Sequence, residues 1–172
     1  MPIRSATPRD IAVITRIYAH AVRHGTASFE VEAPDEAEMT RRYTTLWDGN
    51  FPFIVADING AVAGYAYAGP YRERPAYRFT VEDSIYIDPT MHRRGIGRAL
   101  LARLLAEAEA AGFRQMIAVI GDSANTPSIA LHAAAGFRMV GTFEAAGYKF
   151  DRWIDSVLMQ KPLGSGASAA PV

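Results

Sequence analysis

The residues most suited to bind a charged ligand lie at positions 88–98, which read DPTMHRRGIGR. This segment joins a β-branched and aromatic stretch to an apolar repeat with helical spacing. Gly95 and Gly97 let the backbone approach a ligand closely, and the amide groups at a helix N-terminus attract an anion. Positive charge is added by three arginines, Arg93, Arg94 and Arg98. The segment therefore predicts a pyrophosphate site, against the alternative of a glycine-bearing turn with a solvated basic face.

Two other phosphate-binding motifs fit this segment poorly. A dinucleotide fold has G-x-G-x-x-G after its first strand, whereas here R-R-G-I-G follows about four expected strands. A P-loop has Gly-Lys-Ser/Thr, whereas Gly97 is followed by Arg98 and Ala99.

The hydrophobic periodicity predicts the elements that carry this segment. Strands are expected at 3–6, 51–56, 61–68, 78–88, 115–120, 137–143 and 153–160. Helices are expected at 7–24, 34–49, 98–111 and 125–135. This order predicts an α/β protein with an antiparallel start and crossover helices later. One domain is expected over 1–163, followed by a flexible tail of small residues at 164–172.

Composition narrows the function classes. Lys and Arg number 18, as do Asp and Glu, so the chain lacks the basic excess of a nucleic-acid binder. Cysteine is absent, which excludes a disulfide framework, a Cys-based zinc site and a cysteine nucleophile. The start lacks a signal-peptide core, and no apolar run approaches the ~18 residues of a membrane helix. We expect a cytoplasmic protein with no nucleic-acid or membrane partner.

Two motifs in order resemble the GNAT superfamily of N-acetyltransferases. HRRGIG at 92–97 is similar to its acetyl-CoA signature [Q/R]-x-x-G-x-[G/A], with His92 where Gln or Arg is usual. Asn125 and the run LHAAAGF at 131–137 resemble its second pattern, N-x(6)-[Y/H]-x-x-x-G-F. Further segments resemble the subfamily that acetylates phosphinothricin, methionine sulfoximine and methionine sulfone: 26–30, 65–72, 80–87, 118–121 and 145–150.

The resemblance covers about residues 2–162 and implies a fold, a cosubstrate and an assembly. The fold is a mixed, mostly antiparallel sheet of about seven strands with a splayed central parallel pair and about four flanking helices. The cosubstrate is acetyl-CoA, no metal is implied, and family members are commonly homodimers. The implied reaction is direct attack of a small amino acid's α-amine on the thioester.

The resemblance also assigns catalytic roles. Glu82 matches the proposed general base of the subfamily, the alternative being a surface carboxylate on a strand. His132 stands where many relatives place a Tyr that protonates the leaving thiolate. An imidazolium could do the same, but a packed, hydrogen-bonded core histidine is the competing interpretation.

Residues that hold acetyl-CoA follow from the same motifs. The backbone of the strand at 85–87 is implied to pair with the pantetheine arm and to offer an N–H to the oxyanion. Asn125 is a helix N-cap by position and a pantetheine partner by resemblance, and these roles are compatible. The implied cofactor-binding set is Ile85, Tyr86, Ile87, Arg93, Arg94, Gly95, Ile96, Gly97, Arg98 and Asn125.

The acceptor site is implied by four residues. Arg72 and Arg74 share a face if the chain is extended, and could clamp a carboxylate and a second anionic or oxide group. The alternative is a solvated loop, since Glu73 lies between them. Phe29 and Tyr148 fall in segments that match the subfamily's substrate pocket and dimer contact.

Two other functions remain open at this level. The acceptor could be a peptide N-terminus, a polyamine or an aminoglycoside, although paired arginines favour an anionic acceptor. The chain could also be a non-catalytic acetyl-CoA sensor, which the presence of Glu82 disfavours. His20 and His24 have the i, i+4 spacing of metal ligands, but a solvated helix face is the simpler interpretation.

Overall fold

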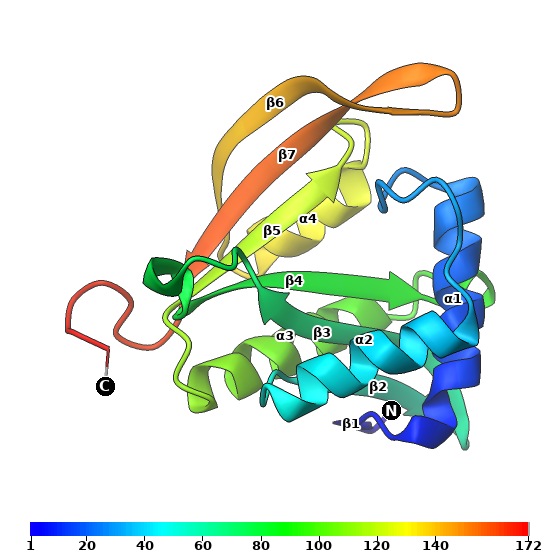
Figure 1. Ribbon diagram of the computed structural model, residues 1–172, viewed down its shortest axis with the longest axis horizontal. Helices are drawn as coiled ribbons and strands as arrows, with labels where there is room; N and C mark the ends of the chain where they lie inside the picture. Colours follow the sequence, from blue (N-terminus) through cyan, green and yellow to red (C-terminus); the bar gives the residue numbers. More distant parts are fainter. Residues whose placement is uncertain (172) are drawn as a thin grey trace.

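A computed structural model describes residues 1–171, which form one mixed sheet with helices on both faces (Figure 1). The strand order is β1-β2-β3-β4-β5-β7-β6. The strands are β1 (Ile3–Ser5), β2 (Phe53–Ile58), β3 (Ala61–Pro70), β4 (Thr80–Ile87), β5 (Gln115–Gly121), β6 (Arg138–Lys149) and β7 (Arg152–Pro162). The helices are α1 (Ile11–His24), α2 (Glu36–Asp48), α3 (Ile96–Ala110) and α4 (Thr126–Ala134). Short 3₁₀ turns cover η1 (Pro8–Asp10), η2 (Pro75–Tyr77) and η3 (Pro89–Met91).

The parallel pair β4–β5 separates after three residue pairs, of which the last is Glu82 with Ile117. Beyond that point β4 stays paired with β3, and β5 stays paired with β7. The facing edges at 83–87 and 118–121 therefore have no strand partner across the gap, and Figure 1 shows the two strands diverging. This is the splayed parallel pair that the family resemblance implied. The predicted fold class is therefore confirmed.

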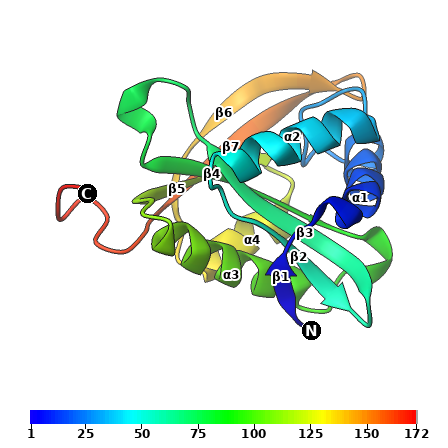
Figure 2. The same ribbon diagram turned by 60° about the horizontal axis from the view of Figure 1, so that its bottom comes forward.

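Both faces of the central strands β2 and β3 are buried because these strands are apolar on both sides. In β2, Ile54 and Ala56 pack against α3, whereas Phe53 and Val55 pack against α1 and α2. Figure 2 shows α2 and α3 on opposite sides of the sheet. The two helical layers therefore divide the molecule into an α3–α4 side and an α1–α2 side, which meet at the opening between β4 and β5.

The last hairpin differs from the expectation. A strand over 137–143 was predicted, but β6 continues to Lys149 through register shifts at Met139/Gly141 and Phe143/Gly147. The run EAAG at 144–147 lacks strand alternation, so the sequence signal ends early. Pairing with β7 and a hydrogen bond from the Ala145 amide to Asp155 hold it in place.

The C-terminal tail contacts the body of the protein. The Arg114 guanidinium donates hydrogen bonds to the carbonyls of Gly166 and Ala169. The expected tail includes Val172, which lies outside the described residues. Within residues 1–171, no helix has both the length and the apolar character needed to cross a membrane.

Candidate active site

A cavity of about 1300 Å³ opens where β4 and β5 separate; we call it the large cavity. Its walls come from α1, from the facing ends of β4 and β5, from the start of α3 and from α4. It is lined by most of the residues predicted from the sequence: Phe29, Glu82, Ile85, Tyr86, Ile87, Arg93, Gly95, Ile96, Gly97, Arg98, Asn125 and His132. Arg72, Arg74, Arg94 and Tyr148 are not among its lining residues.

Glu82 occupies the last β4 position that pairs with β5, at the point where the cavity begins. Its side chain shares a strand face with Ser84 and Tyr86, the face that α1 covers through the Tyr18–Tyr86 ring contact. Burial, reinforced by the charge of Asp83, raises the pKa of Glu82 to about 7. A carboxylate with a pKa near neutrality is suited to accept a proton from an ammonium group.

The glycine loop begins with a short turn and ends at the N-terminus of α3. Asp88 accepts a hydrogen bond from the Thr90 amide and so fixes the start of the turn. Arg93 has φ 63° and Gly95 has φ 75°, and Gly95 is the N-cap of α3. Because a glycine N-cap has no side chain to accept from the first turn, those amides are available to an anion.

Among residues 1–171, a Cβ atom at Gly97 would meet only the side chain of Leu131, at 3.4 Å, which is ordinary packing distance. The protein itself therefore does not require a glycine there, and a ligand that approaches the backbone gives the simplest reason for one. The phosphate interpretation of this loop is consistent with its geometry.

His132 is buried and is bound at both ring nitrogens. Its Nε2 lies 2.9 Å from Oδ2 of Asp83, and its Nδ1–H donates to the Ser128 carbonyl at 2.8 Å. Burial lowers the pKa of His132, but the hydrogen bond and charge of Asp83, with the Ser128 carbonyl, outweigh it, so the pKa is raised. This is the hydrogen-bonded core histidine that the sequence left as one alternative, although its ring also lines the large cavity.

Asp83 is a site residue that sequence reasoning missed. It alternates with Glu82 on β4 and so points to the α3–α4 side, where it ties β4 to α4 across the opening. Its Oδ1 atom is buried with no hydrogen-bond partner among the residues that the structure describes. The only available signal was a second carboxylate beside Glu82 in an otherwise apolar strand.

Asn125 is the N-cap of α4, as its position predicted. Its Oδ1 accepts from the Ser128 amide at 3.3 Å, and its Nδ2 donates to the Gly121 carbonyl at 3.1 Å. The side chain thus joins the end of β5 to the start of α4. Its contact with a pantetheine arm stays a prediction.

The loop between α1 and α2 brings Phe29 to the large cavity. A Cβ atom at Gly121 or Gly147 would lie 2.8 Å or less from the Phe29 ring, so both glycines make room for it. Lys149 is buried, and its Nζ donates to the carbonyls of Gly25 and Ser28. These bonds fasten the loop to β6, so Lys149, which lies in a segment that resembles the subfamily, supports the loop that carries Phe29.

Three expected acceptor residues lie elsewhere. Arg72 is exposed on the β3–β4 connection, with its guanidinium 5.1 Å from the centre of the Tyr71 ring, and Arg74 is exposed beside it. Tyr148 is exposed on the β6–β7 hairpin, with its ring 5.2 Å from that of Trp153. Their roles in binding an acceptor stay predictions.

Residues 3–158 match the family model described as an acetyltransferase (GNAT) domain. The chain belongs to the GNAT acetyltransferase family. It is 50% identical over 169 residues to a phosphinothricin N-acetyltransferase of Alcaligenes faecalis, covering 98% of this chain and 86% of that protein. It is 39% identical over 168 residues to an L-methionine sulfoximine/L-methionine sulfone acetyltransferase of Salmonella typhimurium, covering 98% of each.

A solved GNAT structure has the same fold throughout. The crystal structure of a phosphinothricin acetyltransferase from Sinorhizobium meliloti in complex with AcCoA superposes with a TM-score of 0.96 at 48% identity. The match covers 99% of this chain and 92% of that chain. The GNAT enzyme described here uses acetyl-CoA, and its own geometry fits that molecule through unpaired strand edges, a glycine loop at a helix N-terminus and a cavity joining them.

Proposed function

We propose that this GNAT enzyme transfers an acetyl group from acetyl-CoA to the α-amine of a small amino acid or amino-acid analogue. The names of the two relatives above support this class of acceptor. The observation that carries the chemistry is Glu82, a carboxyl with a pKa of about 7 at the start of the β4–β5 opening.

The proposed reaction needs an unprotonated amine. Acetyl-CoA supplies a thioester carbonyl, where a carbon–nitrogen bond forms as the carbon–sulfur bond breaks and the thiolate leaves. Glu82 takes the proton that the amine loses, directly or through water. His132 already donates from Nδ1 to Ser128 and is hydrogen-bonded through Nε2 to Asp83, so a role as proton donor to the thiolate requires one of these bonds to open.

The cosubstrate would be held by groups on both sides of the opening. Amides at 93–98, with the side chains of Arg93 and Arg98, would bind the pyrophosphate. The unpaired backbone at 85–87 would pair with the pantetheine arm, and one of its N–H groups would face the oxyanion. Asn125 would support the arm from the start of α4. Arg94, which is exposed, would contribute charge from outside the cavity.

The acceptor site would be completed by two further features. Arg72 and Arg74, on the β3–β4 connection, would bind the acceptor carboxylate. A homodimer would cover apolar side chains of β6 and β7 and bring Tyr148 to the site. Large apolar side chains exposed on these two strands support that assembly: Met139, Val140, Phe143, Tyr148 and Trp153, each about half exposed or more.

The test is thiol release from acetyl-CoA against a panel of amines. The panel contains methionine sulfone, methionine sulfoximine, phosphinothricin, spermidine, an aminoglycoside and a short peptide. Turnover confined to the first three supports the proposal. Turnover only of the cations or the peptide overturns the acceptor class, and silence with bound acetyl-CoA favours a sensor.

A further inference from the structure

The β6–β7 hairpin ends in a pair of cations. Lys149 is the last residue of β6 and Arg152 the first of β7, and the two lie directly opposite each other. The turn between them consists of Phe150 and Asp151, with φ of 53° and 54°. Two residues with positive φ are typical of the tight turns that join hairpin strands. Like charges directly opposite each other in a sheet are unfavourable, so each cation needs a partner of its own.

The two cations have different partners, in two neighbouring segments of the cavity wall. Lys149 donates to the carbonyls of Gly25 and Ser28, in the loop between α1 and α2. The Arg152 guanidinium donates instead to Oδ2 of Asp122 at 2.8 Å, in the connection from β5 to α4. One end of the hairpin therefore fastens both segments, and the proposed chemistry has so far given Arg152 no role.

Asp122 organises the turn that leads from β5 into α4. Its Oδ1 accepts from the Ala124 amide at 2.7 Å, and its carbonyl accepts from the Asn125 amide at 2.9 Å. Its side chain is only 5% exposed. Burial raises the pKa of Asp122, but its hydrogen bonds, that from Arg152 first, outweigh burial, so the pKa lies below its usual range. A buried carboxylate is unfavourable without a paired charge, and within residues 1–171 Arg152 is the cation that supplies it.

The turn held by Asp122 places groups that face the large cavity. Gly121 and Asn125 line this cavity, and they are joined by the bond from Nδ2 of Asn125 to the Gly121 carbonyl. Asp122 and Arg152 are not among its lining residues. They would therefore act on a bound ligand only through the turn, as supporting residues that fix the groups in contact with it.

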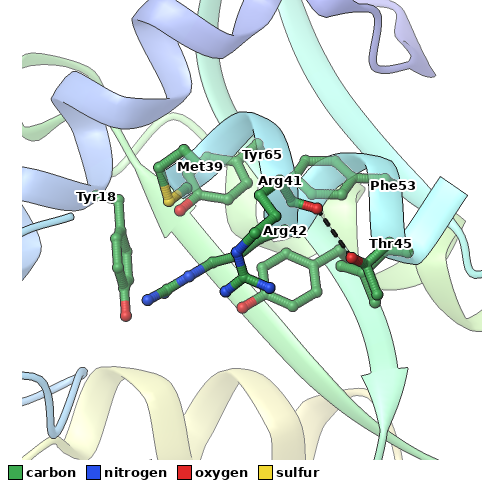
Figure 3. A pocket seen from close by; sticks show the side chains of 9 residues that line it. Tyr18, Met39, Arg41, Arg42, Thr45, Phe53 and Tyr65 are labelled. Atoms are coloured by element: carbon green, nitrogen blue, oxygen red, sulfur yellow. Dashed lines mark hydrogen bonds between the residues drawn. The ribbon is translucent and has the colours of Figure 1, made fainter. Parts of the chain in front are cut away.

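The loop between α1 and α2 has further anchors that do not involve Arg152. Glu30 in this loop accepts from the Tyr18 hydroxyl at 2.8 Å and from the Arg42 guanidinium at 2.6 Å. Tyr18 and Arg42 also line a smaller cavity, of about 230 Å³, between α1, α2 and the sheet (Figure 3). Loss of Arg152 should therefore disturb the turn before α4 and leave the acceptor side in place.

We propose that Arg152 is a positioning residue for acetyl-CoA. Through its ion pair with Asp122 it holds the turn at 121–125, and so keeps Asn125 and the start of α4 where the pantetheine arm passes. This inference rests on the proposed placement of that arm beside Asn125.

The first test is Arg152→Gln, with acetyl-CoA binding measured by calorimetry in the absence of an acceptor. We expect the Kd to rise roughly three- to tenfold, the value of one partly exposed ion pair. The KM for methionine sulfone at saturating acetyl-CoA should not change. Arg138→Gln is the matched control, because Arg138 is exposed on β6, donates to Gln160 and does not line the large cavity. An unchanged Kd in folded Arg152→Gln, or an equal rise in the control, overturns the role of Arg152.

The second test asks whether Arg152 acts through Asp122. A single guanidinium nitrogen, Nη2, bonds to Asp122, so a lysine ammonium can take its place. Arg152→Lys should therefore bind acetyl-CoA within about twofold of the wild type. In an Asp122→Asn background, Arg152→Gln should change the Kd little, because its partner charge is already gone. Failure of Lys to restore binding, or a full effect of Arg152→Gln in that background, overturns the ion pair as the route.

Binding and hydrogen exchange separate this inference from the proposed function. Exchange at 121–128 should be faster in Arg152→Gln than in the wild type, and unchanged in Lys149→Met. A wild type that binds acetyl-CoA but acetylates no amine overturns the proposed transfer, while a weaker Kd in Arg152→Gln still supports the positioning role. An effect of Arg152→Gln confined to the acceptor KM overturns the positioning role and leaves the proposed transfer standing.

Discussion

His132 and Asp83 form a buried pair that joins α4 to β4 on the far side of the opening between β4 and β5, with Nε2 and Oδ2 2.9 Å apart. The next residue along β4, Glu82, points to the opposite face, where the acceptor amine is expected. The cosubstrate side and the acceptor side of the site are thus linked by two adjacent carboxylates on one strand. The charge of Asp83 raises the pKa of Glu82.

Asp83→Asn tests this link. Removing the Asp83 charge lowers the pKa of Glu82, so the acid limb of kcat/KM is expected to move to lower pH. The pKa of His132 falls as well, because Asp83 is what raises it. Unfolding free energy is expected to drop by about 1–3 kcal/mol as the buried pair is weakened. Asp48→Asn, at an exposed position on α2, is the control and should change neither quantity.

Gly97→Glu tests the glycine loop. A carboxylate at this position would face the phosphates and be desolvated beside them, so acetyl-CoA affinity is expected to fall about 100-fold or more. Ala102→Glu, on the exposed side of α3, is the matched control and should bind normally. Calorimetry provides the measurement, and unchanged affinity in a folded Gly97→Glu protein would show that the loop does not bind the phosphates.

Lys149→Met tests the support of the loop that carries Phe29. The variant leaves the carbonyls of Gly25 and Ser28 without their charged donor, which should lower stability by about 1–3 kcal/mol. Faster hydrogen exchange at 25–30 and a higher KM for the acceptor are expected, with little change in acetyl-CoA affinity. Lys161→Met, at the other lysine of the chain, is the control. Equal exchange rates in both variants would contradict a role for Lys149 in ordering the loop.

Local chemistry explains what the sequence predicted well. Gly95 adopts the positive φ that its residue type favours, and Asn125 caps α4 as its position before a helix indicates. Pro8 lies at the start of the first helical segment, where its fixed φ suits the first helical position. Gly25 follows the end of that segment as predicted, although its backbone there is extended. In each case the residue type that makes the prediction lies within a few residues of the backbone feature it predicts.

Tertiary geometry explains what the sequence could not predict. Asp83 and His132 are 49 residues apart, and no spacing rule joins a strand to a later helix. The extension of β6 to Lys149 depends on its pairing with β7, because residues 144–147 have no strand pattern of their own.

The measurement that tests the central claim most directly is the pH dependence of kcat/KM for acetyl transfer to methionine sulfone, in the wild type and in Glu82→Gln. Below its pKa the Glu82 carboxyl is protonated and cannot accept the amine proton, so the wild-type rate should rise with pH through an apparent pKa near 7. Glu82→Gln should lose this limb and about 10²–10⁴-fold of the rate, with acetyl-CoA affinity unchanged. Full activity and the same acid limb in Glu82→Gln would contradict the assignment of Glu82 as the base.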